Sequence, residues 1–314
     1  MRGFAVRRWA VMCIALMMLV VAGLPATAQP AAEEFDLGDS TVTQARLAGD
    51  ARFYTMPVPL RGIVAVPDGE GPFPVAIIVH GSYSFCTAPL INHADQWPCP
   101  DEHDLRQYRG FSDLAGALAA RGYLTIVPDL AAEYTNGWAE AVFGERTSQM
   151  LMQIVERLGT GEGFPADVAG KADTSQILMA GHSRGAPQAL YFSEQRVAAG
   201  LPPVDALAMI TPAAWHNAIP EDMSVALVTG TCDGDLGTRD SEFWIEQLEP
   251  LRPSLTVLET LEGFTHNAIS TALRGDPFQI CAPEDIVAVE TQRAWLSEFI
   301  PGFFDLVRTT SPHR

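Results

Sequence analysis

The sequence is poor in positive charge. Its 314 residues include 20 Lys and Arg against 38 Asp and Glu, which gives a formal net charge of −18 at pH 7. Such a surface repels nucleic-acid phosphates and anionic membranes, because both bind proteins largely through cationic side chains. The composition therefore argues against nucleic acid as a partner and suits neutral or cationic substrates.

Beyond residue 28 the sequence lacks low-complexity tracts, internal repeats and any apolar run of the ~20 residues that cross a bilayer. Hydrophobic residues make up 47% of the chain, which is enough for a substantial core. We therefore expect residues 29–314 to form a single domain with no stable insertion into a membrane.

The amino terminus is different. Three arginines within the first eight residues precede an uncharged apolar run of 16 residues, Trp9 to Leu24, and then the small-residue stretch Pro25 to Ala28. This layout is typical of a secretory signal peptide, whereas a retained anchor would need a longer run. We expect residues 1–28 to be a signal peptide and the mature chain to be secreted or periplasmic. Losing three of the 20 basic residues would leave it with a charge of −21.

Cysteine is scarce as well. Of five cysteines, Cys13 lies in the apolar leader, and four remain: Cys86, Cys99, Cys232 and Cys281. An even number in an exported chain indicates two disulfides, and four cysteines allow three pairings.

Buried-strand patterns alternate with helical patterns along the rest of the chain. The strand patterns, rich in β-branched residues, cover 75–79, 124–127, 177–180, 206–210, 225–228 and 255–258, after shorter strands within 42–67. Helical periodicity covers 111–121, 138–158, 184–199, 241–248 and 287–299, the last ending before Pro301. This alternation predicts an α/β fold whose mostly parallel sheet carries helices on both faces.

One motif falls where such a sheet binds ligands, beyond the carboxyl ends of its strands. Residues 181–185 read Gly-His-Ser-Arg-Gly, directly after one predicted strand and directly before a helix. A serine on this sharp turn is exposed for nucleophilic attack, and glycines two residues on either side avoid collisions. The motif predicts that Ser183 is a catalytic nucleophile.

A serine nucleophile needs a base, and the base needs an acid; in this type of site they follow in the order Ser, Asp or Glu, His. Asp233 and Asp235 follow the strand pattern at 225–228, and His266 follows the one at 255–258. We predict Asp233 and His266 as the partners of Ser183, with Asp235 as the alternative acid or as a cap of the next helix. The six other histidines have the wrong place or order in the chain.

The two aspartates do not form a calcium loop. An EF-hand that began at Asp233 would require Gly and Glu where the sequence has Thr238 and Trp244. No metal or cofactor is expected.

Acyl transfer also needs hydrogen-bond donors for the oxyanion. In this type of site they are the backbone N–H after the nucleophile and one from the loop after an earlier strand. The corresponding residues are Arg184 and, in the turn His80-Gly81-Ser82-Tyr83, Ser82, with Tyr83 as the alternative.

Five motifs stand together in the mature chain: His80-Gly81-Ser82, Trp97-Pro98-Cys99-Pro100, Gly122-Tyr123, Gly181-His182-Ser183-Arg184-Gly185 and Cys232-Asp233-Gly234-Asp235. The set resembles the α/β-hydrolase superfamily over essentially all of residues 29–314. More narrowly, it is similar to exported bacterial hydrolases of the dienelactone-hydrolase, chlorophyllase and cutinase-like polyester-hydrolase branches.

The resemblance implies an eight-stranded sheet, a Ser183–His266–Asp233 triad and hydrolysis of small-molecule or polymeric carboxylic esters. It also implies the disulfides Cys86–Cys99 and Cys232–Cys281. An acyltransferase would use the same residues, and a non-catalytic binding protein could share the scaffold, so both remain as alternatives.

Overall fold

The computed structural model describes residues 29–40, 58–83, 85–87, 98–134, 144–214, 219–220, 222–248, 256–273 and 280–310. The predicted signal peptide lies outside these residues, and so does most of the stretch 42–67. Within the described part of the chain, no helix is both long and apolar enough to cross a bilayer.

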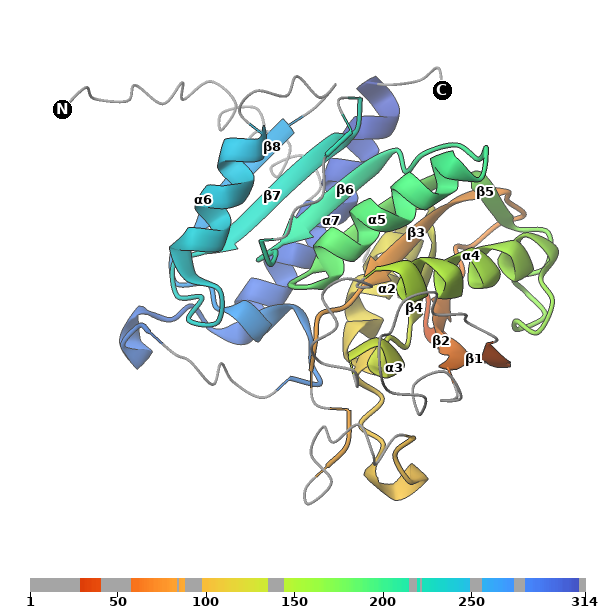
Figure 1. The fold of residues 1–314 in the computed structure, drawn as a ribbon, viewed down its shortest axis with the longest axis horizontal. Helices are drawn as coiled ribbons and strands as arrows, with labels where there is room; N and C mark the ends of the chain where they lie inside the picture. The colour runs from red at the N-terminus through yellow and green to blue at the C-terminus, as the bar shows by residue number, and fades with distance from the viewer. Residues whose placement is uncertain are drawn as a thin grey trace, which may run out of the picture.

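The fold is built on one eight-stranded sheet with the strand order β1-β2-β4-β3-β5-β6-β7-β8 (Figure 1). Its strands are β1 (Ala32–Ser40), β2 (Val58–Ala65), β3 (Phe73–Val79), β4 (Leu124–Pro128), β5 (Ala172–His182), β6 (Ala206–Ile210), β7 (Ser224–Gly230) and β8 (Thr256–Leu261). Only the β1–β2 and β2–β4 pairings are antiparallel. The predicted mostly parallel sheet is therefore confirmed.

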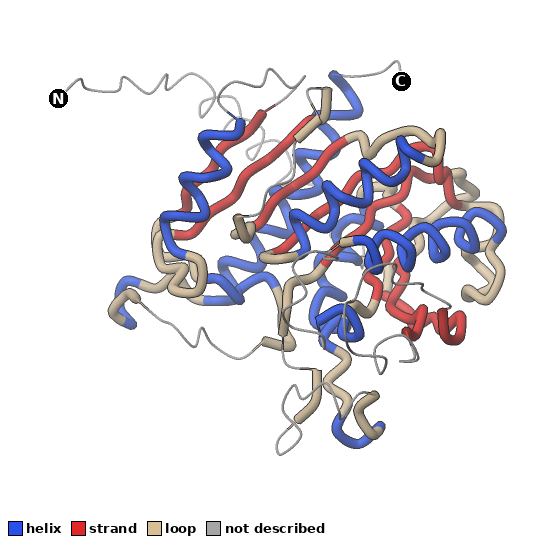
Figure 2. The backbone as a smooth tube through the Cα atoms, viewed as in Figure 1, coloured by secondary structure: helices blue, strands red, loops and turns tan. Residues whose placement is uncertain are grey.

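Helices cover both faces of the sheet (Figure 2). The front layer in Figure 1 contains α4 (Glu145–Thr160), α5 (Gly185–Ala198) and α6 (Gly237–Leu248), and the back layer contains α2 (Ser112–Ala120) and α7 (Val289–Thr310). Alternate residues of each strand enter the two cores: Val75 and Ile77 of β3 pack with the front layer, and Ala76 and Ile78 with the back layer. This double burial explains the uninterrupted apolar patterns of β3 to β7. The pattern at 255–258 also predicted a buried strand, which was wrong: β8 is the last strand of the sheet, and its residues alternate between exposed and half-buried.

Strand β1 was not predicted from the sequence. It is an edge strand of mostly polar residues, and only Phe35 and Leu37 of its nine residues are buried. Two apolar side chains among many acidic ones give little strand signal, so its pairing with β2 decides its conformation.

The prediction that the last helix ends before Pro301 was wrong, because α7 continues through this proline to Thr310. A proline inside a helix removes one hydrogen bond and costs about 3 kcal/mol. Beyond it, Phe303, Phe304 and Val307 are buried against the back face of the sheet. Each such side chain gains about 1.5–3 kcal/mol on burial, so together they outweigh the proline.

Candidate active site

Ser183 lies on a sharp turn between two elements that the core holds in place. Strand β5 ends at His182 and α5 begins at Gly185, and Ser183 between them has a left-handed φ of 53°. That conformation costs a non-glycine residue about 1–3 kcal/mol. The Ser183 N–H donates to Ile210 O at 3.0 Å, and its carbonyl accepts from Ala213 N at 3.1 Å. Hydrogen bonds from the neighbouring β6 segment therefore help to hold the strained turn.

Two glycines make this turn possible by allowing close approach. A Cβ atom on Gly185 would stand 2.0 Å from Val79 O, and one on Gly81 would stand 2.7 Å from the Ser183 Cβ. The loop after β3 therefore packs directly on the serine. Ser82, the predicted oxyanion donor, follows Gly81 in this loop, and Arg184, the other predicted donor, immediately precedes α5.

Asp233 and His266 form a buried pair beyond the ends of β7 and β8. His266 Nδ1 lies 2.9 Å from Asp233 Oδ2, and the two side chains are 2% and 5% exposed respectively. The other Asp233 oxygen, Oδ1, accepts from the backbone N–H groups of Asp235 and Leu236 at 3.0 and 3.1 Å. Both carboxylate oxygens are thus occupied, which fixes the orientation of the carboxylate beside the imidazole.

Asp235 occupies the opposite side of the same ring. Its Oδ2 lies 3.4 Å from His266 Nε2, and its side chain is 41% exposed. The imidazole of His266 therefore stands between a buried carboxylate at Nδ1 and a partly exposed one at Nε2.

His182, the residue before the serine, connects the loop after β3 to His266. Its Nε2 lies 2.8 Å from the His266 carbonyl oxygen, and its Nδ1 contacts the Tyr83 hydroxyl. A carbonyl only accepts, so Nε2 carries the proton and Nδ1 accepts from Tyr83. Burial, with the charge on His266 as a smaller cause, lowers the pKa of His182 well below its ordinary value. Its ring is therefore a neutral link between two loops.

Comparison with known proteins identifies the fold. The chain matches no protein-family model and no curated protein. Among solved structures it is similar to an alpha/beta hydrolase enzyme from a Medee basin deep-sea metagenome library, with a TM-score of 0.51 and 14% identity over 89% of this chain and 99% of that one. The chain has the α/β-hydrolase fold.

Two further solved structures share the α/β-hydrolase fold with this chain. A dienelactone hydrolase-like promiscuous phosphotriesterase from metagenomic libraries has a TM-score of 0.51 and 12% identity, over 86% of this chain and 98% of that one. A thermophilic esterase from the Planctomycetes species Thermogutta terrifontis has the same TM-score and identity, over 77% and 87%. At such low identity the likeness establishes the fold alone.

His80 holds the start of the loop after β3 in this α/β-hydrolase fold. Its Nε2 accepts from Leu130 N at 3.0 Å, so Nδ1 carries the proton that is donated to Gly81 O at 2.8 Å. The Tyr134 hydroxyl donates to the His80 carbonyl at 2.7 Å. Burial lowers the pKa of His80, which favours this neutral form.

Two disulfides flank the site, Cys86–Cys99 and Cys232–Cys281, and these are the pairs that the resemblance implied. Cys232 immediately precedes Asp233, and its N–H donates to Phe264 O at 2.9 Å. That disulfide therefore joins the segment at residue 281 to the loop that carries the buried carboxylate.

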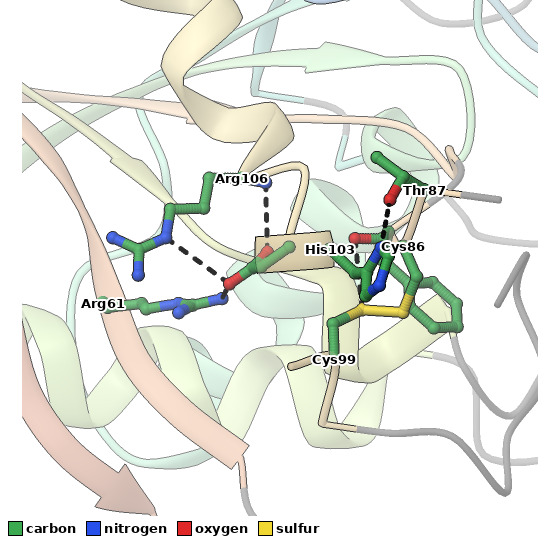
Figure 3. Close-up of a disulfide and its surroundings, with 8 residues drawn as sticks. Arg61, Cys86, Thr87, Cys99, His103 and Arg106 are labelled. Atoms are coloured by element: carbon green, nitrogen blue, oxygen red, sulfur yellow. Dashed lines mark hydrogen bonds and ion pairs between the residues drawn. A yellow bond between two sulfur atoms is a disulfide. The ribbon is translucent and has the colours of Figure 1, made fainter. Parts of the chain in front are cut away.

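The Cys86–Cys99 disulfide lies beside a cluster of charges (Figure 3). Arg61 of β2 pairs with Asp104 at 2.6 Å and with Asp129 at 2.7 Å, and both carboxylates are almost fully buried. Arg106 also contacts Asp104, through Nε at 3.5 Å. Through its ion pair with Asp104, the guanidinium of Arg61 thus anchors the connection between β3 and α2 to the sheet.

Three features could not be predicted from the sequence: the contacts of His182 with Tyr83 and His266, the ion pairs of Arg61, and the position of Asp235 beside His266 Nε2. Their partners lie far away in the chain: His182 and His266 are 84 residues apart, and Arg61 and Asp129 are 68 apart. No local signal could have paired them. His103 lies in the turn Asp101–His103 and contacts Thr87, whereas His93, His216 and His313 lie outside the described residues.

Proposed function

We propose that this chain is an exported serine hydrolase that cleaves carboxylic esters, with Ser183 as nucleophile, His266 as base and Asp233 as acid. The observation that carries the proposal is the 2.9 Å hydrogen bond between His266 Nδ1 and Asp233 Oδ2 at the strand ends where Ser183 lies. Because Nδ1 is engaged by the carboxylate of Asp233, the proposal assigns the transfer of the hydroxyl proton to Nε2.

In the proposed reaction, the Ser183 hydroxyl attacks the ester carbonyl while its proton passes to His266 Nε2. The negative charge on the tetrahedral oxygen is stabilised by backbone N–H groups, those of Arg184 and Ser82, and Asp233 stabilises the imidazolium. The imidazolium then protonates the leaving alcohol, and an acyl-enzyme forms. Water, deprotonated by His266, attacks the acyl-enzyme and releases the acid and Ser183.

Substitution of the nucleophile tests the proposal. We expect Ser183→Ala to abolish turnover of p-nitrophenyl acetate and labelling by a fluorophosphonate probe, with a melting temperature near that of the wild type. Ser175→Ala, on an exposed part of β5, is the matched control and should label normally. Turnover by the Ser183→Ala protein would refute the nucleophile, and a wild type that neither labels nor hydrolyses esters would refute the function.

Water as acceptor is a separate part of the proposal, because an acyltransferase would pass the acyl group to an alcohol instead. We expect the free acid as the main product when glycerol competes with water at millimolar concentration. A glycerol ester as the main product would assign the chain to the acyltransferases.

Export is the third part, and the two disulfides support it because such bonds persist in oxidising compartments. Mass spectrometry of the protein from the periplasm or medium of an expressing bacterium should find a chain that begins at Gln29. A full-length chain retained in the cell would contradict the signal peptide.

A further inference from the structure

Asp235 belongs neither to the proposed triad nor to the proposed oxyanion donors. Asp233 is buried and all its hydrogen bonds go to neighbouring groups of the protein. Asp235, two residues later, is 41% exposed and holds its Oδ2 3.4 Å from His266 Nε2. A charged side chain that is open to solvent and adjacent to the basic nitrogen can meet a substrate.

The proposed function indicates which half of a substrate would lie next to Asp235. Nε2 is the nitrogen that would return a proton to the leaving group, so the leaving atom must come within about 3 Å of it. Asp235 Oδ2 approaches that same nitrogen. The alcohol half of an ester, rather than its acyl half, would therefore lie next to this carboxylate.

The carboxylate of Asp235 also acts on the loop after β3. Burial is the main cause that raises the pKa of Tyr83, Tyr134 raises it further, and the Asp235 carboxylate is a smaller cause in the same direction; Tyr83 belongs to the loop that packs on Ser183. The chain as a whole carries −18, which attracts cations and repels anions at longer range.

Resting on the proposed function, we propose that Asp235 is a specificity-determining residue that selects esters with a cationic alcohol half and disfavours those with an anionic one. A unit charge about 4 Å from the carboxylate in water gains or loses enough free energy to change a rate constant about fivefold.

Three thioacetates that differ only in the leaving thiol test this selection. Acetylthiocholine is cationic, S-(3,3-dimethylbutyl) thioacetate is its neutral isostere, and S-acetyl-3-mercaptopropanesulfonate is anionic; the released thiol is measured with Ellman's reagent. The proteins compared are wild type, Asp235→Asn and Glu246→Gln. Glu246 is an exposed acid on α6, so its variant removes the same charge from the same part of the chain.

In Asp235→Asn we expect the cation-to-neutral ratio of kcat/KM to fall about fivefold and the neutral-to-anion ratio to fall by a similar factor. Glu246→Gln should leave both ratios at the wild-type value. Arg184, the basic residue next to Ser183, is present in all three proteins, so the change in ratio reports Asp235 alone. Ratios that stay constant in Asp235→Asn, or that change equally in Glu246→Gln, would overturn the proposal.

Failure of the proposed function gives a different result. A wild type that is not labelled by the fluorophosphonate probe and cleaves neither p-nitrophenyl acetate nor any of the three thioesters would refute the hydrolase, and the charge selection is then decided by binding. Calorimetric titration with phenyltrimethylammonium should give a Kd about fivefold weaker for Asp235→Asn than for the wild type. Equal Kd values would overturn the role of Asp235 whether or not the chain is an enzyme.

Discussion

Two parts of the molecule meet at Ser183, and they are held in different ways. The described parts of the β3–α2 connection, residues 80–83, 85–87 and 98–111, are held by the Cys86–Cys99 disulfide together with the buried ion pairs of Arg61. The acid–histidine loops, residues 231–236 and 262–268, are fixed by backbone hydrogen bonds and by Cys232–Cys281. His182 connects the two parts through Tyr83 on one side and the His266 carbonyl on the other.

The buried carboxylates have different partners in the two parts of the molecule. Arginine neutralises the carboxylate of Asp104 in the β3–α2 connection, and Arg61 also neutralises Asp129, which directly follows β4. In the acid–histidine loops the carboxylate of Asp233 is held by two backbone N–H groups and by the imidazole of His266, and no Arg or Lys of the described residues pairs with it. The first arrangement stabilises a loop, and the second, in the proposed function, leaves a negative charge beside the imidazole that would take the serine proton.

The largest effect is expected from removing the charge in the acid–histidine loops. Asp233→Asn keeps the shape of the side chain but no longer stabilises an imidazolium or fixes its tautomer, so kcat for p-nitrophenyl acetate should fall about 10⁴-fold. Asp235→Asn should lower kcat far less. An equal or greater loss in Asp235→Asn would move the role of acid from Asp233 to Asp235.

The next effect is on stability in the β3–α2 connection. Arg61→Met would leave the buried carboxylates of Asp104 and Asp129 without their shared cation, so the free energy of unfolding in urea should fall by about 3–5 kcal/mol. Arg121 pairs with Asp305 and Glu298 on the surface, with its side chain 39% exposed, and Arg121→Met should cost less than about 1 kcal/mol. Similar losses in the two variants would show that the Arg61 pairs do not anchor the connection.

A pH effect tests the link between the two parts. The lowered pKa of His182 means that the unfolded chain binds this proton first as the pH falls below about 6.5. Stability is therefore fully present above that pH and decreases below it, by up to about 1.4 kcal/mol per pH unit for each such histidine. His182→Gln keeps a donor and an acceptor but does not titrate, so its unfolding free energy should decrease less steeply from pH 6.5 to 5.5. An unchanged slope would contradict a neutral His182 in the folded protein.

The smallest effect is the difference between the two disulfides. Their cysteines are 49 and 13 residues apart for Cys232–Cys281 and Cys86–Cys99 respectively. Loop-closure entropy then predicts a stabilisation of about 4 and about 3 kcal/mol. Replacing each pair by serine and measuring urea unfolding should give losses in that order, about 1 kcal/mol apart. The reverse order would mean that contacts of the folded loops, rather than the unfolded chain, determine these contributions.

Features that depend mainly on neighbouring residues could be predicted from the sequence alone. Glycines at 181 and 185 and the strand before them identify the turn of Ser183. The collision that Gly181 avoids is local, with the backbone of Ala186, whereas the one that Gly185 avoids is with Val79 of β3 and exists only in the folded protein. Apolar periodicity identified the strands that are buried on both faces, and it failed for β1, whose conformation depends on pairing with β2. It also failed beyond Pro301, where burial outweighs the local effect of proline.

Contacts between side chains that are far apart in the chain could be seen only in the tertiary structure. The sheet order brings the ends of β5, β7 and β8 to one edge, and this places His182 against His266 and the two carboxylates of Asp233 and Asp235 on opposite sides of one imidazole. Local rules extend over a few residues, whereas these contacts join segments tens of residues apart. Their geometry depends on how the whole sheet packs between its two layers of helices, which no short stretch of sequence specifies.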